Sequence, residues 1–377
     1  MAIHYIDNLN KSIDAVKNMI AEISTCKYIG IDTETTGLDP FIDQVLLVQL
    51  KIGDNIYVLN RGKLGLEFTK SLIKRIKDNG ILCIGHNIKF DMKMICQDTG
   101  ILLYDVYDTM VMESVITSGL GSKFVSLKEL VLKYCNVTLD KDTRLDFIGM
   151  TRESEFTEQQ IMYSAYDVLY LFDIYNQQMK LAEEAHMGKI VGIECQVEPV
   201  VAKMEMAGIL LDIPMWNKLT EAAKKEAVIL KGKLKDILFE ALPIERYDNA
   251  YKFAIAIAIP INTKRLKNAL EKIIDPLTVL AWAKDNFNID SHKQLLTALN
   301  LAGIDTPSTN EKVLNKLPKN KIIDTIIEYR GFEKQISTYG DNVVAAVCPV
   351  TGRIHADFNQ VGTASGRFSS GSGDRDK

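Results

Sequence analysis

The fold of this chain is decided by the stretch Tyr28-Ile29-Gly30-Ile31-Asp32-Thr33-Glu34-Thr35-Thr36-Gly37-Leu38. Its apolar first half predicts a buried strand, and Asp32 and Glu34 stand at the end of that strand. Because side chains two residues apart point to the same face of a strand, the two carboxylates should lie together. Such a pair can begin a divalent-metal site. The pair alone is a weak signal, because 49 acidic residues among 377 supply several acid-x-acid pairs by chance.

The sequence around this stretch predicts an α/β domain that ends near residue 185. Residues 27–33, 44–51 and 56–59 are rich in Ile, Val, Leu and Tyr, and polar turns separate them, which predicts three strands of a meander. Residues 81–84 predict a further short, buried strand. Helical spacing predicts helices over residues 66–78, 88–98, 109–117, 126–135 and 157–184. Strands followed by a mixture and then by helices are typical of an α/β domain.

From residue 190 onward the pattern becomes mainly helical. Helices are predicted over residues 190–206, 214–240, 263–286 and 291–302. No element is assigned to residues 251–261, an apolar piece that ends in a proline. The small and charged residues at the C-terminus predict a flexible tail.

The composition is that of an ordinary globular protein, with 25% charged and 47% apolar residues. No stretch approaches about 18 apolar residues without charge, so we expect no membrane span. The N-terminus has no basic region followed by an apolar one, which argues against a signal peptide and for a cytoplasmic location. The six cysteines are scattered without a CxxC motif, as reduced core cysteines are.

The net charge of −4 conceals an acidic first part, up to about residue 200, and a mildly basic remainder. This asymmetry fits a carboxylate-metal site joined to a region that contacts phosphates. Charge alone favours a simpler explanation, namely solvated helix faces.

Two further acidic motifs follow the first. Gly85-His86-Asn87-Ile88-Lys89-Phe90-Asp91 comes directly after the predicted strand at 81–84, and Tyr163-Ser164-Ala165-Tyr166-Asp167 lies within the predicted helix at 157–184. Tyr163 and Asp167 are four residues apart and therefore share one helix face. Four carboxylates from three segments could thus converge on one cleft.

Oxygen ligands alone suit hard cations such as Mg²⁺ or Mn²⁺. Two such ions could activate a water and stabilise the leaving oxygen of a phosphodiester. The Tyr163 hydroxyl could hold that water without ionising. Each piece also has a plain structural explanation: a solvated turn at Asp32, a helix cap at Asn87, a core packing role for Tyr163. Taken together these explanations are weaker, because they would have to account at once for the order, the spacing and the secondary-structure context of all three motifs.

The motifs DTETTGL, GHNIKFD and YSAYD, in this order, resemble the three exonuclease motifs of the DEDD superfamily, in its tyrosine subclass. Residues 107–114 are similar to a further stretch of the proofreading domain of family A DNA polymerases. The resemblance implies a ribonuclease H-like 3′–5′ exonuclease domain, with a mixed central sheet flanked by helices. It also implies roles for seven residues: Asp32, Glu34 and Asp167 hold the tighter of two divalent cations, Asp91 with Asp32 holds the second, Tyr163 orients the water, Leu38 wedges against the terminal base, and Asn87 lies near the terminal nucleotide.

The second half resembles the same polymerase family. Residues 190–212 are similar to the linker into the polymerase thumb, and residues 287–295 to the thumb segment that follows the duplex backbone. The stretches at 327–339 and 351–360 match the approach to the palm, and Thr363-Ala364-Ser365-Gly366-Arg367 matches the first palm motif. The resemblance implies DNA contacts by Lys293, Gln294, Asn359, Thr363 and Arg367, the last of these in the minor groove of the primer-template.

Two departures from the family stand out. Residues 243–286 lie where the family has a much shorter connection. The similarity to the family stops at Ser370. The polymerase metal aspartates are therefore not in this sequence, and we expect no nucleotidyl transfer by this chain alone. The expected domains are a 3′–5′ exonuclease at 1–188, a mostly α-helical thumb-like region at 189–340, the start of a palm at 341–370 and a tail at 371–377.

The predicted function is metal-dependent hydrolysis of the 3′-terminal phosphodiester of DNA, as in proofreading, with release of nucleoside 5′-monophosphates. The expected partners are a single-stranded 3′ end, a primer-template duplex through the thumb, and a second polypeptide with the rest of the palm and the fingers. One alternative is an exoribonuclease of the RNase D type, which shares the three motifs. Another is a non-catalytic DNA-binding or assembly subunit of a split polymerase.

Overall fold

The computed structural model describes residues 2–117, 125–139, 147, 149–242, 276–363 and 365–371. Most of the predicted insert at 243–286 and nearly all of the predicted tail lie outside these residues, as does the unassigned piece at 251–261. The chain forms two compact units, one of residues 1–210 with 348–377 and one of residues 211–347. The domain boundaries expected at residues 188 and 340 stay predictions.

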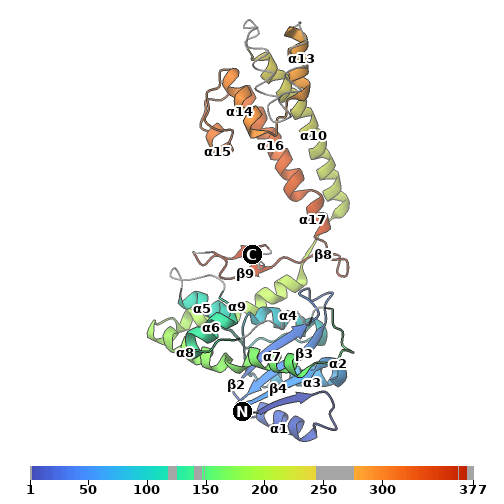
Figure 1. Cartoon of the computed structure of the whole chain (residues 1–377), viewed down its shortest axis with the longest axis vertical. Helices are drawn as coiled ribbons and strands as arrows, with labels where there is room; N and C mark the ends of the chain where they lie inside the picture. Colours follow the sequence, from blue (N-terminus) through green and yellow to red (C-terminus); the bar gives the residue numbers. More distant parts are fainter. Residues whose placement is uncertain are drawn as a thin grey trace. The chain divides into compact units, whose positions relative to one another are not determined.

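A six-stranded mixed sheet lies at the centre of the first unit (Figure 1). Its strands, in the order β1-β4-β3-β2-β5-β6, are Ala2–Ile6, Asn55–Asn60, Val45–Ile52, Tyr28–Thr35, Leu82–Gly85 and Val106–Asp108. The predicted meander is confirmed, because β2, β3 and β4 pair antiparallel in sequence order. β1, β5 and β6 join it by parallel pairing.

Helices cover both faces of this sheet (Figure 1). Successive strand residues point to opposite faces, so Tyr57 and Leu59 enter one hydrophobic core while Ile56 and Val58 enter the other. The first core also takes apolar side chains from α1 (Ile13–Ile23), α3 (Leu66–Asp78) and α4 (Ile88–Thr99). The second takes them from α5 (Thr109–Ile116), α6 (Leu127–Cys135), α7 (Glu158–Leu169) and α8 (Leu171–Glu184). The expected α/β class, with a mixed sheet flanked by helices, is confirmed.

The single helix predicted over 157–184 is wrong, because the structure has two helices that meet at Tyr170. Tyr170 lies outside the helical region, with φ −100° and ψ 2°. Neither glycine nor proline marks the break, so the sequence gives no signal for it. Val168 and Leu171, on the two sides of the break, are both fully buried in the second core.

The first unit also contains α2 (Arg61–Leu64), α9 (Gly188–Ala207) and a segment that returns after residue 347. In that segment β8 (Arg353–Ile354) pairs with β7 (Ile209–Leu210), and β9 (Phe358–Asn359) pairs with β10 (Ser369–Ser370). Gly208 directly follows α9, and its φ of 61° suits glycine. A Cβ there would meet the His355 ring and the Ile354 carbonyl, which lie 2.7–2.9 Å away.

The second unit is helical in its described residues. Its helices are α10 (Ile213–Glu240), α13 (Pro276–Asn286), α14 (His292–Leu301), α15 (Glu311–Leu314), α16 (Lys321–Tyr339) and α17 (Asp341–Ala345). α10 and α16 pack along each other around a core that includes Leu234 and Ile326. No helix among the described residues combines the length and apolar character that crossing a membrane requires.

Candidate functional site

Three carboxylates meet where β2 and α7 pack together. One carboxylate oxygen from each of Asp32, Glu34 and Asp167 lies within 4.8 Å of the others. Glu34 is buried, and the two aspartates are half-buried. Three converging carboxylates with access to solvent form a donor set that fits a hard divalent cation. The structure therefore brings together three of the four predicted metal ligands.

The fourth predicted ligand, Asp91, lies in the first turn of α4 and outside this cluster. Its carboxyl Oδ1 accepts a hydrogen bond of 2.6 Å from the hydroxyl of Thr33, the residue between Asp32 and Glu34. Burial raises the pKa of Asp91 to about 7, the Thr33 hydroxyl opposes this rise, and the Asp108 charge adds to it. A cation beside Asp91 would favour its ionised form.

Tyr163 lies one turn before Asp167 on α7 and is 8% exposed. A capping box begins this helix, because Thr157 accepts from the Gln160 backbone N–H and Gln160 accepts from that of Thr157. A pocket of about 410 Å³ opens beside Tyr163. Its lining residues are Val137, Thr138, Leu139, Gln159, Met162, Tyr163, Tyr166 and Tyr170.

The two residues expected near the terminal nucleotide lie in the segments that follow β5 and β2. Asn87 precedes α4 with a φ of 58°, a left-handed conformation that asparagine tolerates. Its backbone N–H donates to Asp108 Oδ1 at 3.0 Å, which fixes the start of α4. Leu38 follows β2 and is 69% exposed, so its side chain is available to a ligand.

The residues expected to contact DNA fall in both units. In the first, Thr363 Oγ1 holds the backbone of the exposed Arg367 through hydrogen bonds of 2.8 and 2.9 Å, and Asn359 lies half-buried in β9. In the second, Lys293 is exposed on α14. Gln294 is only 4% exposed, and its amide oxygen accepts from the Asn288 N–H at 2.7 Å. Gln294 therefore has little surface to offer DNA.

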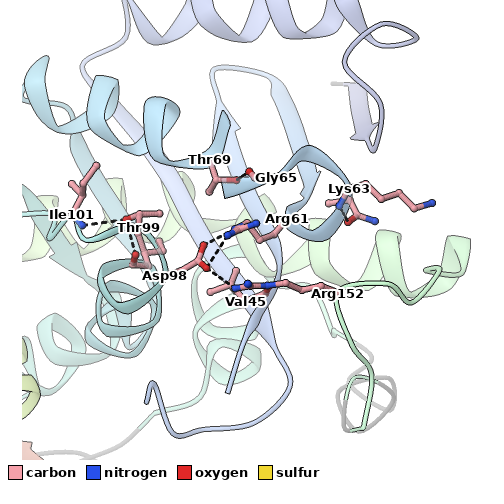
Figure 2. Close-up of polar contacts among 11 residues, drawn as sticks. Val45, Arg61, Lys63, Gly65, Thr69, Asp98, Thr99, Ile101 and Arg152 are labelled. Carbon is pink, nitrogen blue, oxygen red and sulfur yellow. Dashed lines mark hydrogen bonds and ion pairs between the residues drawn. The ribbon is translucent and has the colours of Figure 1, made fainter. Parts of the chain in front are cut away.

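A buried ion cluster that the sequence did not predict ties the approach to α7 onto α4 and α2. Figure 2 shows Asp98 of α4 between Arg61 and Arg152. The Arg61 guanidinium donates to both Asp98 oxygens, at 2.6 and 3.1 Å, and Arg152 also donates to the Val45 carbonyl at 3.3 Å. A Cβ on Gly62 would lie 1.9 Å from the Arg152 carbonyl oxygen, so glycine allows this close approach.

Asp108 is a second residue that sequence reasoning missed. It caps α5 by accepting from the Met110 and Val111 N–H groups at 2.8 and 3.2 Å, and it also holds Asn87. The signal was present, because an aspartate directly before an apolar helical run is a frequent N-cap.

Comparison with known proteins agrees with this geometry. Residues 10–183 match the family described as 3′–5′ exonuclease, and residues 261–373 match the family described as DNA polymerase family A. DNA polymerase I of Borreliella burgdorferi is 25% identical over 365 residues, which cover 94% of this chain and 35% of the relative. DNA polymerase I of Aquifex aeolicus is 25% identical over 376 residues, which cover 95% of this chain and 55% of the relative.

A solved structure gives a related fold. The POL domain of Pol1 from M. smegmatis, in complex with DNA primer-template and dNTP, has a TM-score of 0.57 at 20% identity. The match covers 94% of this chain and 53% of that one. The chain thus spans between about a third and about a half of the length of the relatives and the structure named here.

Proposed function

Because the chain belongs to DNA polymerase family A and carries a 3′–5′ exonuclease domain, we propose that it removes nucleotides from the 3′ end of DNA by metal-dependent hydrolysis. The products are nucleoside 5′-monophosphates. The observation that carries the proposal is the convergence of Asp32, Glu34 and Asp167 within 4.8 Å. Residues 32 and 34 lie on a strand and residue 167 on a helix far away in sequence, so the fold itself assembles the set.

The proposed cofactors are two divalent cations, Mg²⁺ or Mn²⁺. Asp32, Glu34 and Asp167 would hold one, and Asp91 together with Asp32 would hold the other. Such ions lower the pKa of water and stabilise a leaving phosphate oxygen. The all-carboxylate donor set supports hard cations over zinc, which prefers nitrogen and sulfur ligands.

The chain's own residues orient the substrate and the water. The Tyr163 hydroxyl, one turn from Asp167, would position the attacking water by a hydrogen bond and would stay protonated. Leu38, exposed in the loop after β2, would pack against the terminal base. Asn87 would lie beside the terminal nucleotide, because its backbone leads directly into α4 and Asp91.

We also propose that the chain acts in DNA replication, as the editing part of a polymerase in the cytoplasm of a bacterial or phage-infected cell. The bacterial DNA polymerase I relatives support this setting. Primer-template DNA would contact Arg367, Thr363, Asn359 and Lys293, with Gln294 holding its neighbouring loop.

The two alternatives fit less well. Similarity to DNA polymerase I extends over 94% of the chain, including the region after the exonuclease domain, which favours DNA over the RNA substrate of an RNase D-type enzyme. A non-catalytic subunit would have no need for the whole set Asp32, Glu34, Asp91, Tyr163 and Asp167, which this chain retains.

The test is degradation of a 5′-labelled single strand in Mg²⁺ or Mn²⁺ by the wild type, Asp32→Ala and the control Asp54→Ala. Asp54 lies in the β3–β4 turn, away from the cluster. We expect Asp32→Ala to lose more than about 100-fold in rate, because a direct ligand should matter more than the groups around it. Equal rates for the wild type and Asp32→Ala would refute the exonuclease, and faster cleavage of RNA than of DNA would favour the RNase D-type alternative.

A further inference from the structure

Helix α4 is held from the side opposite Asp91. Lys89 and Lys93 are four residues apart and share one face, while Asp91 projects about 200° around the helix from Lys89. Both lysines bind one carboxylate of α9: Lys89 Nζ lies 2.7 Å from Glu205 Oε1, and Lys93 Nζ lies 2.6 Å from Glu205 Oε2. The Glu205 side chain is 2% exposed and the Lys89 side chain 8%.

The same carboxylate binds the segment that returns after residue 347. Glu205 Oε1 accepts from the Phe358 N–H at 2.7 Å, and Lys89 Nζ donates to the Phe358 carbonyl. Lys93 also pairs with Asp357 at 3.3 Å, and the Glu205 carbonyl lies 2.8 Å from His355 Nδ1. Both oxygens of the carboxylate are thus engaged, and the second partner of each lysine comes from residues 357–358.

The returning segment also reaches the other side of the site. The ring of His355 packs on that of Phe41, with centroids 4.0 Å apart. Phe41 belongs to the loop after β2 that also carries Leu38. Residues 355–358 therefore contact both α4, which bears Asp91, and the loop that follows the Asp32–Glu34 strand.

The energetics make this network selective for one arrangement of α4. Loss of the carboxylate would leave the buried Lys89 ammonium and the largely buried Lys93 ammonium without their shared counter-charge and so destabilise the fold. α4 is therefore held where both lysines reach Glu205. Because each lysine and the carboxylate have several hydrogen-bond partners here, the network should make this part of the core rigid. Since α4 is a single helix of 12 residues, a shift of Lys89 and Lys93 carries Asp91 with it.

We propose that Glu205 is a positioning residue for Asp91. Through Lys89, Lys93 and the Phe358 backbone it sets the position of α4, so that the polymerase-family segment at 355–358 is a working part of the exonuclease site. This inference rests on the proposed function, because it takes Asp91 as a ligand of the second cation. The inference goes beyond that function in one respect: the exonuclease site needs residues that follow the exonuclease domain by more than 150 positions in the sequence.

The experiment measures Mn²⁺ binding by calorimetry and by the electron paramagnetic resonance of free Mn²⁺. The full chain is used, bound to a short single strand whose last linkage is a phosphorothioate that resists hydrolysis. Asp91→Asn identifies the binding step that depends on Asp91. Glu205→Gln is the test variant. Glu113→Gln is the matched control, since Glu113 is also a buried glutamate of the first unit and pairs with Lys133 at 2.5 Å.

We expect Glu205→Gln to weaken the Asp91-dependent step by about tenfold and to leave the other step unchanged, whereas Glu113→Gln changes neither. Unchanged binding in Glu205→Gln, or equal weakening of both steps, would overturn the positioning role. Should Glu205→Gln fail to fold, Lys93→Met serves as the test variant with the same expected and contradicting outcomes, because it removes the pairs of Lys93 with Glu205 and Asp357 and keeps the Lys89–Glu205 pair. No Mn²⁺ binding by the wild type would instead refute the proposed function.

Discussion

Tyr163 is a residue whose proposed role depends on one hydroxyl group. Its ring is 8% exposed and its centroid lies 6.2 Å from that of Phe147. Tyr163→Phe keeps this packing and removes the group that would orient the water, so we expect kcat to fall by about 10- to 100-fold. Single-turnover hydrolysis of a labelled strand measures the effect. Tyr166→Phe, at a 40% exposed site on the same helix, should leave kcat unchanged.

Glu198 of α9 is a buried acid whose ionisation should destabilise the first unit. It is 1% exposed, and its Oε2 has no hydrogen-bond partner among the described residues. Burial raises the pKa of Glu198 well above its usual value, the nearby Asp108, Glu205 and Glu194 charges add to this rise, and Lys89 opposes it. The folded state therefore binds the proton more tightly than the unfolded state, and stability falls as pH rises above the unfolded pKa.

Glu198→Gln removes this titration. We expect the variant to gain stability relative to the wild type as the pH rises from about 5 to about 8, measured by calorimetric unfolding of the first unit. Glu184→Gln, at an exposed position in α8, should show no such trend. A difference between Glu198→Gln and the wild type that is constant with pH would show that Glu198 does not titrate differently in the folded chain.

At the scale of elements, Asp98 joins three parts of the first unit that lie far apart in sequence (Figure 2). Asp98→Asn would leave the buried Arg61 without a counter-charge, which should cost about 3 kcal/mol of unfolding free energy. Because Arg152 leads into α7, Asp167 should also lose its fixed position and activity should fall. The control is Asp78→Asn, whose exposed pair with Lys74 contributes less than about 1 kcal/mol. Equal calorimetric stability of the two variants would contradict this role.

The elements that sequence predicted best are those with strong local signals. The strands β2, β3 and β4 follow from apolar runs bounded by polar turns, whereas helical spacing at 157–184 predicted helix but not its division into α7 and α8. β1, β6 and α1 were not predicted. The two strands are short and are completed by pairing with the sheet, whereas α1 has apolar residues at helical spacing that were not used. The break at Tyr170 was not predicted either, because no glycine or proline stands there.

The residues of the candidate site likewise fall into those that the sequence predicted and those that it did not. Asp32, Glu34 and Asp167 were predicted from motif order and spacing, and the fold brings them together. The burial of Gln294 was not predicted, because a polar residue in the first turn of a helix is expected to be exposed. Nor could sequence alone link Lys89 to Glu205, since an ion pair between residues 116 positions apart leaves no local pattern.

At the scale of the whole molecule, the chain leaves its first unit at residue 210 and returns to it at 348. The β7–β8 pairing joins the outgoing and the returning chain. The second unit is therefore an insertion between two parts of the first, with a hydrophobic core of its own. Because all four predicted metal ligands lie in the first unit, the second should be open to destabilisation without loss of the exonuclease site.

Leu234→Ala tests this independence. Leu234 of α10 is fully buried in the core of the second unit, so its truncation should lower the free energy of unfolding of this unit by about 2–5 kcal/mol. Both tryptophans of the chain, Trp216 and Trp282, lie in the second unit, so their fluorescence in urea reports its unfolding alone. We expect the fluorescence midpoint to fall while hydrolysis of a short single strand without urea stays within about twofold of the wild type.

The control is Val228→Ala on the same helix, at a site 71% exposed, which should change neither quantity. Loss of hydrolysis in Leu234→Ala in parallel with the fluorescence change would mean that the two units fold as one cooperative body. Retained hydrolysis would instead show that the chemistry does not depend on the stability of the second unit. In that case Leu234→Ala should lose affinity for primer-template DNA before it loses activity on single strands, because Lys293 lies in the unit that the substitution loosens.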